Sequence, residues 1–177
     1  MTGLMKILDE GLISRIRRNH ALEHATLQIA SQKNARLRLA GYSDGGGFWI
    51  IGQVDTLLLK EAANEALERL KKGETGLAIH PSCGTNFVFS GLVTGTLAWL
   101  GMLFVGHRFK DKLDRWPVVV SLATVGLIVS QPIGPKIQAN ITTKADPGDL
   151  KIFEIIRREN NERNNVPVHR IRTRDQE

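Results

Sequence analysis

The stretch Asn19-His20-Ala21-Leu22-Glu23-His24-Ala25-Thr26 decides how the rest of this chain is interpreted. It lies inside segment 5–33, which we expect to form one continuous helix. His20 and His24 are one helical turn apart and Glu23 stands beside them, so all three side chains leave the helix on one face. Two imidazoles and a carboxylate in this arrangement are typical of a metal site.

The same helical face carries the apolar residues Ile13, Ile16 and Leu27, so we expect it to point into a core. Buried imidazole and carboxylate groups need partners, because an unsatisfied group costs about 1–3 kcal/mol. A metal ion would satisfy the three groups together. A hydrogen-bonded cluster without metal is the alternative, and we favour the metal.

Two later segments are apolar and uncharged: 86–106 (NFVFSGLVTGTLAWLGMLFVG) and 116–135 (WPVVVSLATVGLIVSQPIGP). Each has about 20 residues, which is enough to cross a bilayer core of about 30 Å as a helix. Because only the short segment 107–115 separates them, they predict a transmembrane helical hairpin. A buried hairpin in a soluble protein is the alternative, but the remaining chain is too short to cover both helices.

The expected location follows from the charges. Segment 1–10 has no apolar region typical of a signal peptide, so we expect both termini in the cytoplasm and a multi-pass protein of the inner (cytoplasmic) membrane. The basic loop 107–115 opposes this topology, because the positive-inside rule keeps Lys and Arg on the cytoplasmic side. The net charge of +6 favours the lipid bilayer as partner and no nucleic acid, since no nucleic-acid motif is present.

The residues before the apolar segments predict a small α+β domain. Alternation in 36–40 indicates a strand, a glycine-rich turn occupies 43–47, and 48–54 indicates a second strand. A helix capped by Asp55 or Thr56 extends to about residue 72, and 77–79 predicts a third strand. The order helix, strand, strand, helix, strand describes two layers, with the helices on one face of the sheet.

Three parts are therefore expected. Residues 1–85 form a metal-binding α+β domain, 86–135 the transmembrane hairpin, and 136–177 a C-terminal amphipathic helix (146–160) followed by a polar tail with little order. The small sheet has exposed edges, and a homodimer would cover them.

A second group of chemically useful residues precedes the hairpin, in His80-Pro-Ser-Cys83-Gly-Thr-Asn86. Cys83 is the only cysteine, which excludes an intrachain disulfide, and its thiol suits zinc or ferrous iron as a third ligand beside His20 and His24. His80 competes for this role, and Glu65 is a weaker candidate. Alternatively, the segment is a turn that caps the next helix, with Cys83 as a small buried residue.

Residues 20–24 match the inverted zincin motif His-x-x-Glu-His. With the order of helices and strands, the first 85 residues resemble pitrilysin-type metallopeptidases and S-ribosylhomocysteinases. The resemblance implies His20, His24 and Cys83 as metal ligands and Glu23 as acid/base. Several features depart from it. Pitrilysin-type enzymes are far larger, with paired domains and a glutamate third ligand. S-ribosylhomocysteinases have no membrane hairpin and carry a second, catalytic cysteine that is missing here.

The longer phrases 18–26 (RNHALEHAT) and 77–86 (LAIHPSCGTN), followed by apolar spans, resemble an uncharacterised family of bacterial membrane proteins. This resemblance covers most of the chain. It supports the architecture and implies no activity.

The function expected from these residues is a membrane-anchored metal-dependent hydrolase, with a peptidase as one form. Zn (or Fe) would be held by His20, His24 and Cys83, with an open position and Glu23 as acid/base. The alternative is a non-catalytic membrane protein or complex subunit. There the same residues, joined by His80, would form a closed structural metal or haem site, or a hydrogen-bonded His/Glu cluster.

Overall fold

The structure is a computed structural model that describes residues 7–9, 11–158 and 166–175. The chain divides into two compact units. The first consists of Met1–His80 together with Ala139–Glu177, and the second is Pro81–Gln138.

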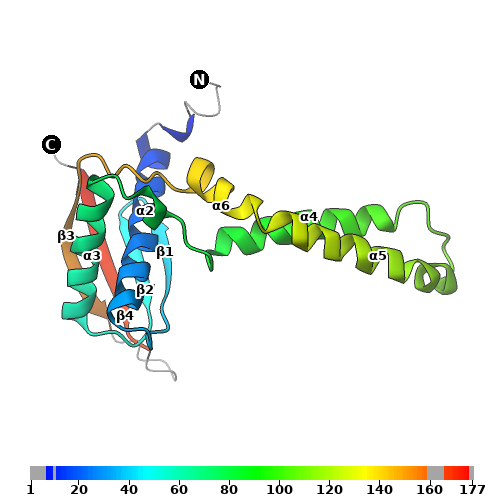
Figure 1. Cartoon of the computed structure of the whole chain (residues 1–177), viewed down its shortest axis with the longest axis horizontal. Helices are drawn as coiled ribbons and strands as arrows, with labels where there is room; N and C mark the ends of the chain where they lie inside the picture. Colours follow the sequence, from blue (N-terminus) through cyan, green and yellow to red (C-terminus); the bar gives the residue numbers. More distant parts are fainter. Residues whose placement is uncertain (1–6, 10, 159–165, 176–177) are drawn as a thin grey trace. The chain divides into compact units, whose positions relative to one another are not determined.

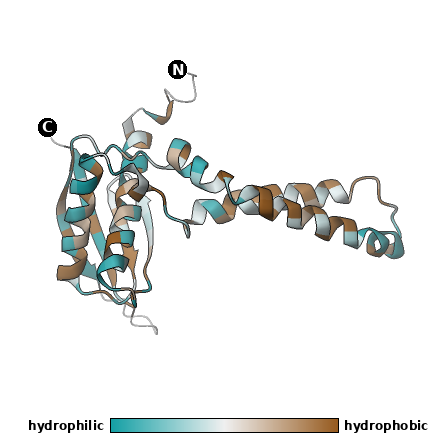
Figure 2. Ribbon diagram, viewed as in Figure 1, coloured by the Kyte–Doolittle hydropathy of each residue, from teal (hydrophilic) through white to brown (hydrophobic). Residues whose placement is uncertain are grey.

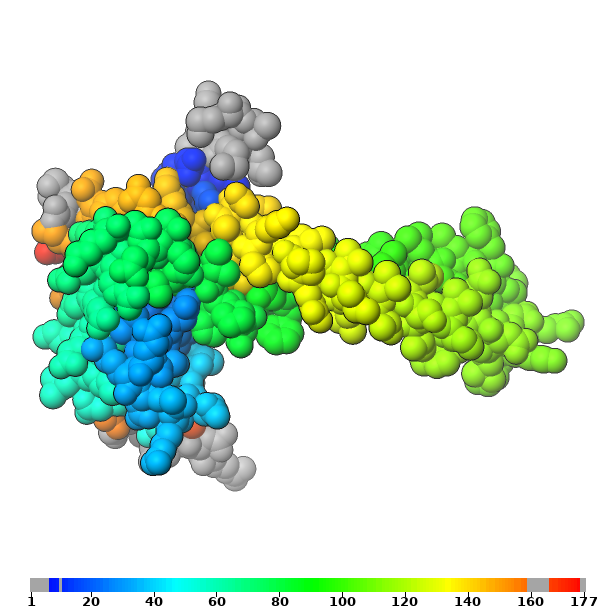
Figure 3. Space-filling view, viewed as in Figure 1, coloured from blue at the N-terminus to red at the C-terminus, as the bar shows by residue number. Residues whose placement is uncertain are grey.

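The first unit has a mixed α+β fold, as predicted. Helices α2 (Gly11–Lys33) and α3 (Thr56–Lys71) lie against one face of an antiparallel sheet and cover it (Figures 1 and 3). Within the described residues the sheet has the strand order β1-β2-β4-β3. The strands are β1 (Ala40–Asp44), β2 (Gly47–Ile51), β3 (Leu150–Arg158) and β4 (Val168–Asp175).

The predicted β-hairpin is present in β1 and β2, with shifted bounds. Asp44 pairs with Gly47, so the turn contracts to Gly45 and Gly46 and the first strand occupies residues 40–44 instead of 36–40. Phe48 and Ile50 of β2 point toward the helices and are fully buried. They pack with the inward-facing residues of α2, α3, β3 and β4, which together form the core: Leu22, Ile29, Leu59, Leu150 and Ile171.

The expected C-terminal helix over 146–160 is wrong, because residues 150–158 form strand β3. A β-bulge between Ile152 and Glu154 interrupts the alternation of inward and outward residues. The apolar positions 150, 152, 153, 155 and 156 therefore imitate helical spacing in the sequence. Residue 159 and residue 160 lie outside the described residues.

The expectation of little order after residue 161 is also wrong for the part that the structure describes. Val168–Asp175 forms β4, which lies between β2 and β3. His169, Ile171 and Thr173 alternate along it and are buried, while the residues between them are basic. This alternation is a strand signal that the high charge of the segment obscured.

Two further local predictions have opposite outcomes. Asp55 caps α3 as expected, because its carboxylate accepts hydrogen bonds from the backbone N–H groups of Leu57 (2.8 Å) and Leu58 (3.2 Å). The strand expected at 77–79 is wrong: residues Thr75–Ala78 form a short 3-10 helix, η1.

The second unit contains α4 (Gly84–Gly101), α5 (Phe109–Ser130) and α6 (Ile133–Ile137), and the π-helical turn η2 (Gln138–Thr142) follows. Helices α4 and α5 pack antiparallel (Figure 1). A Cβ atom on Gly126 would lie 2.9 Å from the Cα of Thr94, so this glycine permits the close approach of the two helices. At the opposite end from their connecting loop, the hydroxyl of Ser130 donates to that of Ser90 at 2.9 Å.

Among the helices in the described residues, α5 is long and apolar enough to cross a membrane. The expected transmembrane hairpin is therefore represented by one candidate span rather than two. Helix α4 contains several Gly, Thr and Ser residues, which lower its mean hydropathy. Both helices nevertheless contain many hydrophobic residues (Figure 2). Large apolar side chains on them are exposed, including Phe87, Val88, Leu92, Trp99, Phe109, Trp116, Leu127 and Ile128.

Candidate metal centre

Helix α2 buries polar side chains where a core helix would normally bury apolar ones. Asn19 is 0 % exposed, Glu23 3 % and His24 2 %, and His20 is partly buried. The spacing predicts that the helical face is buried from Ile13 onward, but Ile13 itself is 41 % exposed. The imidazoles and the carboxylate therefore occupy the part of the helix that faces protein.

Both histidines are bound through the same ring nitrogen. The Nδ1 of His24 lies 2.7 Å from the carbonyl oxygen of Ala78, and the Nδ1 of His20 lies 3.0 Å from that of Thr142. A carbonyl oxygen can only accept, so each Nδ1 must carry the proton and donate it. In each neutral ring the lone pair is therefore on Nε2, which is the state that a metal-ligating histidine needs.

The carbonyl of Ala78 belongs to a segment that α2 itself holds in place. Gln28, one turn beyond His24, donates from its Nε2 to the carbonyl oxygens of Leu77 (2.8 Å) and Ile79 (2.9 Å). These carbonyls flank Ala78 on both sides. The orientation of the His24 ring is thus determined by a backbone segment with three hydrogen bonds to one helix.

Arg17 holds in place the backbone segment whose carbonyl contacts His20. Its NH2 donates to the carbonyl oxygens of Asn140 (2.9 Å) and Thr143 (3.0 Å), on either side of Thr142. Arg17 is only 6 % exposed, although its basic sequence context is typical of a solvated surface. The sequence alone offered no signal for these anchors, because the acceptors are backbone carbonyls.

His20 and His24 lie one turn apart on α2, and their imidazole rings have their centroids 4.3 Å apart. Cys83, the third candidate ligand, is buried and belongs to the second unit. Cys83 occupies the N-cap position of α4, but its thiol makes no capping hydrogen bond.

Glu23, which is next to His24 in the sequence, is buried and packs against β1. A Cβ atom on Gly41 would lie 2.7 Å from Oε1 of Glu23, so the carboxylate lies directly over the backbone of this glycine. The ring of His80 lies 5.7 Å from that of His24 between centroids, so it is near the pair of imidazoles on α2.

Two other titratable residues, Glu65 and His169, lie away from the two histidines of α2. Glu65, the weaker ligand candidate, lies on the surface of α3, where it pairs with Lys33 at 2.9 Å. His169, to which the sequence assigned no role, is completely buried, and its Nε2 lies 3.0 Å from the hydroxyl of Thr56. Burial lowers the pKa of His169 below its ordinary value, and the nearby Arg157 lowers it further.

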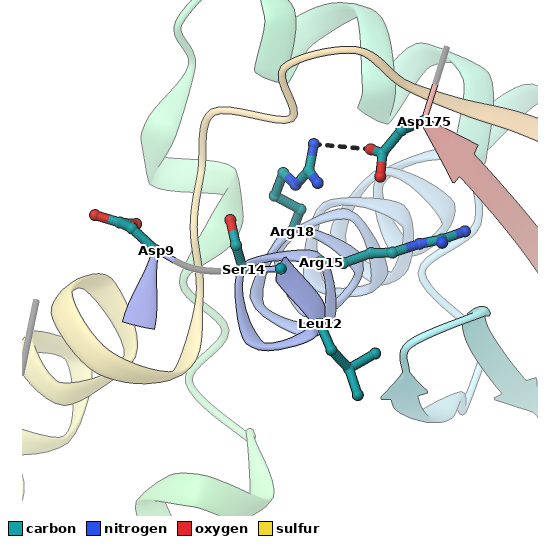
Figure 4. Close-up of a pocket in the computed structure, with 7 residues that line it drawn as sticks. Asp9, Leu12, Ser14, Arg15, Arg18 and Asp175 are labelled. Carbon is teal, nitrogen blue, oxygen red and sulfur yellow. Dashed lines mark ion pairs between the residues drawn. The ribbon is translucent and has the colours of Figure 1, made fainter. Parts of the chain in front are cut away.

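A separate pocket of about 430 Å³ lies at the beginning of α2 (Figure 4). Asp9, Ser14, Arg15, Arg18 and Asp175 line it. Its cations are already engaged within the protein, since Arg18 pairs with Asp175 at 2.9 Å and Arg15 donates to a carbonyl of β4. The described residues that line it include no histidine or cysteine.

The chain is thus a protein with an α+β unit that carries an adjacent pair of histidines on α2 and with an apolar helical unit. It belongs to the family described as a domain of unknown function (DUF6391), which matches residues 15–155. An uncharacterised protein of Picosynechococcus sp. is 35 % identical over 175 residues, which covers 92 % of this chain and 80 % of that protein. No solved structure matches the chain.

Proposed function

We propose that the chain is a membrane-attached, metal-dependent hydrolase whose zinc ion is held by His20, His24 and Cys83. The observation that carries the proposal is the adjacent pair of imidazoles on α2, with ring centroids 4.3 Å apart and both rings held in the metal-ligating tautomer. Two nitrogens and one sulfur are a ligand set that suits zinc, and ferrous iron is the second choice.

Three protein ligands leave one position of a tetrahedral site open to water and substrate, as in catalytic zinc sites. When bound, zinc would supply a Lewis acid that polarises a carbonyl group and acidifies water. Glu23 would accept the proton of the attacking water at its carboxylate and pass it to the leaving group.

Attachment to a membrane is proposed from the second unit. Helix α5 meets the length and composition of a membrane span, and α4 and α5 together expose apolar side chains that water solvates poorly. The proposed substrates are therefore those that a membrane-attached enzyme can reach, with amide or ester bonds.

The second candidate function is a non-catalytic subunit with a structural metal. It is favoured by the proximity of the His80 ring to His24, because a rotation of His80 would add a fourth protein ligand. The two functions differ in the coordination shell. Three protein ligands indicate the hydrolase, and four indicate the structural site.

Glu23→Gln tests the hydrolase directly. We expect the purified variant to retain about one zinc per chain while hydrolysis of p-nitrophenyl acetate and labelled casein falls by at least about 100-fold, since Gln cannot take a proton. Glu65→Gln, at a surface carboxylate, is the matched control and should match the wild type in both measurements.

Cys83→Ser and His20→Ala should both lose zinc in the same metal determination. X-ray absorption of the zinc-loaded wild type should show two nitrogens and one sulfur from the protein. A wild-type protein that binds no zinc, or a Glu23→Gln variant with normal turnover, contradicts the hydrolase. Coordination of the zinc ion by three nitrogens and one sulfur from the protein supports the structural site.

A further inference from the structure

We propose that the outer face of the sheet, on the side opposite α2 and α3, docks on anionic lipid headgroups. This outer face is defined by alternate residues of the four strands: Tyr42, Trp49, Lys151, Phe153, Arg158, Arg170, Arg172 and Arg174. The proposal rests on the membrane attachment proposed above, and it assigns a role to residues outside the proposed metal site.

Trp49 lies at the centre of one half of this face. Tyr42, its cross-strand partner, stacks on it with ring centroids 6.0 Å apart and planes inclined by 17°. The guanidinium groups of Arg170 and Arg158 lie 4.8 Å and 5.6 Å from the Trp49 ring. These are cation–π distances, so the indole and the two cations form one continuous surface.

Phe153 forms the other half. It is 46 % exposed, because the bulge turns it out of the core. The guanidinium groups of Arg172 and Arg174 lie 5.6 Å and 5.4 Å from its ring. Aromatic rings surrounded by arginines therefore extend across both halves of the outer face.

Internal ion pairs neutralise only part of this charge. Arg170 pairs with Asp44 at 2.7 Å, and Arg172 pairs with Glu154 at 3.1 Å. Hydrogen bonds from Arg170 and the Gly46 N–H outweigh the burial that would raise the pKa of Asp44, so this carboxyl stays ionised. Lys151, Arg158 and Arg174 are exposed and form no ion pair with the residues that the structure describes.

This chemistry fits a lipid surface better than nucleic acid. Single-stranded nucleic acid requires aromatic faces on which bases can stack, but Tyr42 and two guanidinium groups already cover the ring of Trp49. Trp, Tyr, Arg and Lys are the residues that favour the headgroup region, and exposed cations attract anionic lipids there. No local sequence pattern reveals this patch, because the strands that assemble it are distant in the chain.

The test uses the full chain in vesicles with Trp49 as its only tryptophan, made by Trp99→Phe and Trp116→Phe. Quenching of Trp49 by brominated lipids reports its contact with the bilayer. We expect quenching to rise at least twofold when about 30 % phosphatidylglycerol replaces phosphatidylcholine, and about 0.5 M salt to reverse the rise. Replacing Lys151, Arg158 and Arg174 together with Gln should abolish it.

The matched control replaces Lys60, Lys71 and Lys72 with Gln, which removes the same charge from the region of α3, and it should keep the response. Equal quenching in neutral and anionic vesicles, or equal loss in both triple variants, would overturn the proposal. So would binding of a poly-thymidine oligonucleotide that requires the outer face while anionic lipid has no effect. A chain that does not bind neutral vesicles at all contradicts membrane attachment instead.

Discussion

Asn19 shows how single buried polar residues hold this fold together. Its amide nitrogen donates to the carbonyl of Asp44 at 2.8 Å, and its oxygen accepts from the hydroxyl of Thr173 at 2.6 Å. The side chain thereby joins α2 to the β1–β2 turn and to β4. Both the amide nitrogen and the amide oxygen therefore have partners within the protein, which is why the helix can bury this amide beside the histidines.

We predict that Asn19→Ala lowers the free energy of unfolding by about 2–3 kcal/mol, because it leaves two buried polar groups without their partner. Urea unfolding in detergent, followed by far-ultraviolet circular dichroism, measures the change. Asn64→Ala, at an exposed position of α3, should change the stability by less than about 0.5 kcal/mol. Equal effects of the two substitutions would contradict this role for Asn19.

His169 should make the stability of the first unit depend on pH. Its pKa in the folded protein lies below the ordinary value of 6.5, so the unfolded chain binds more protons between the two values. The stability is therefore complete above about pH 6.5 and declines as the pH falls through the folded pKa. Unfolding at a series of pH values should show this decline.

His169→Gln should reduce that pH dependence, because the amide does not titrate. His107→Gln is the matched control, since His107 lies exposed in the loop between α4 and α5 and should leave the decline unchanged. If both variants retain the full decline, His169 is not its source.

At the scale of elements, β4 holds the sheet together, because it pairs with both β2 and β3. Gly47 of β2 has a φ of 136°, and a Cβ atom there would collide with the backbone carbonyl of Ile171 in β4. The strands approach so closely only because this residue lacks a side chain. The contact could not be expected from the sequence, since residues 52–167 separate the two strands and β4 was expected to have little order.

We predict that Gly47→Ala costs more than about 3 kcal/mol of stability, since it adds a steric clash to an unfavourable backbone conformation. Gly73→Ala is the control: its φ is also positive, at 88°, but no atom lies within 4 Å of the new Cβ. It should cost only about 1–2 kcal/mol. Chemical unfolding compares the two, and similar losses would refute the clash.

At the scale of the whole molecule, the apolar second unit is the feature with the largest consequence. We predict that the full chain co-floats with phosphatidylcholine vesicles and resists extraction by alkaline carbonate. Replacing Leu127 and Ile128 of α5 with Glu should release it, because each charge in a bilayer core costs about 2.5–3.5 kcal/mol. Glu at the exposed Leu57 of α3 is the control and should leave flotation unchanged. A chain that stays in the aqueous fraction contradicts the prediction.

The sequence by itself determined the α+β class, the β-hairpin of β1 and β2 and the cap of α3, because these depend on local spacing. The tertiary structure alone decided the rest. The spacing of apolar residues in β3 resembles that of a helix unless its bulge is known, and β4 is recognised as a central strand only through its pairing. The carbonyls of Ala78 and Thr142, which orient the two imidazoles, lie far from them in the chain. Such contacts follow from packing, which no local pattern encodes.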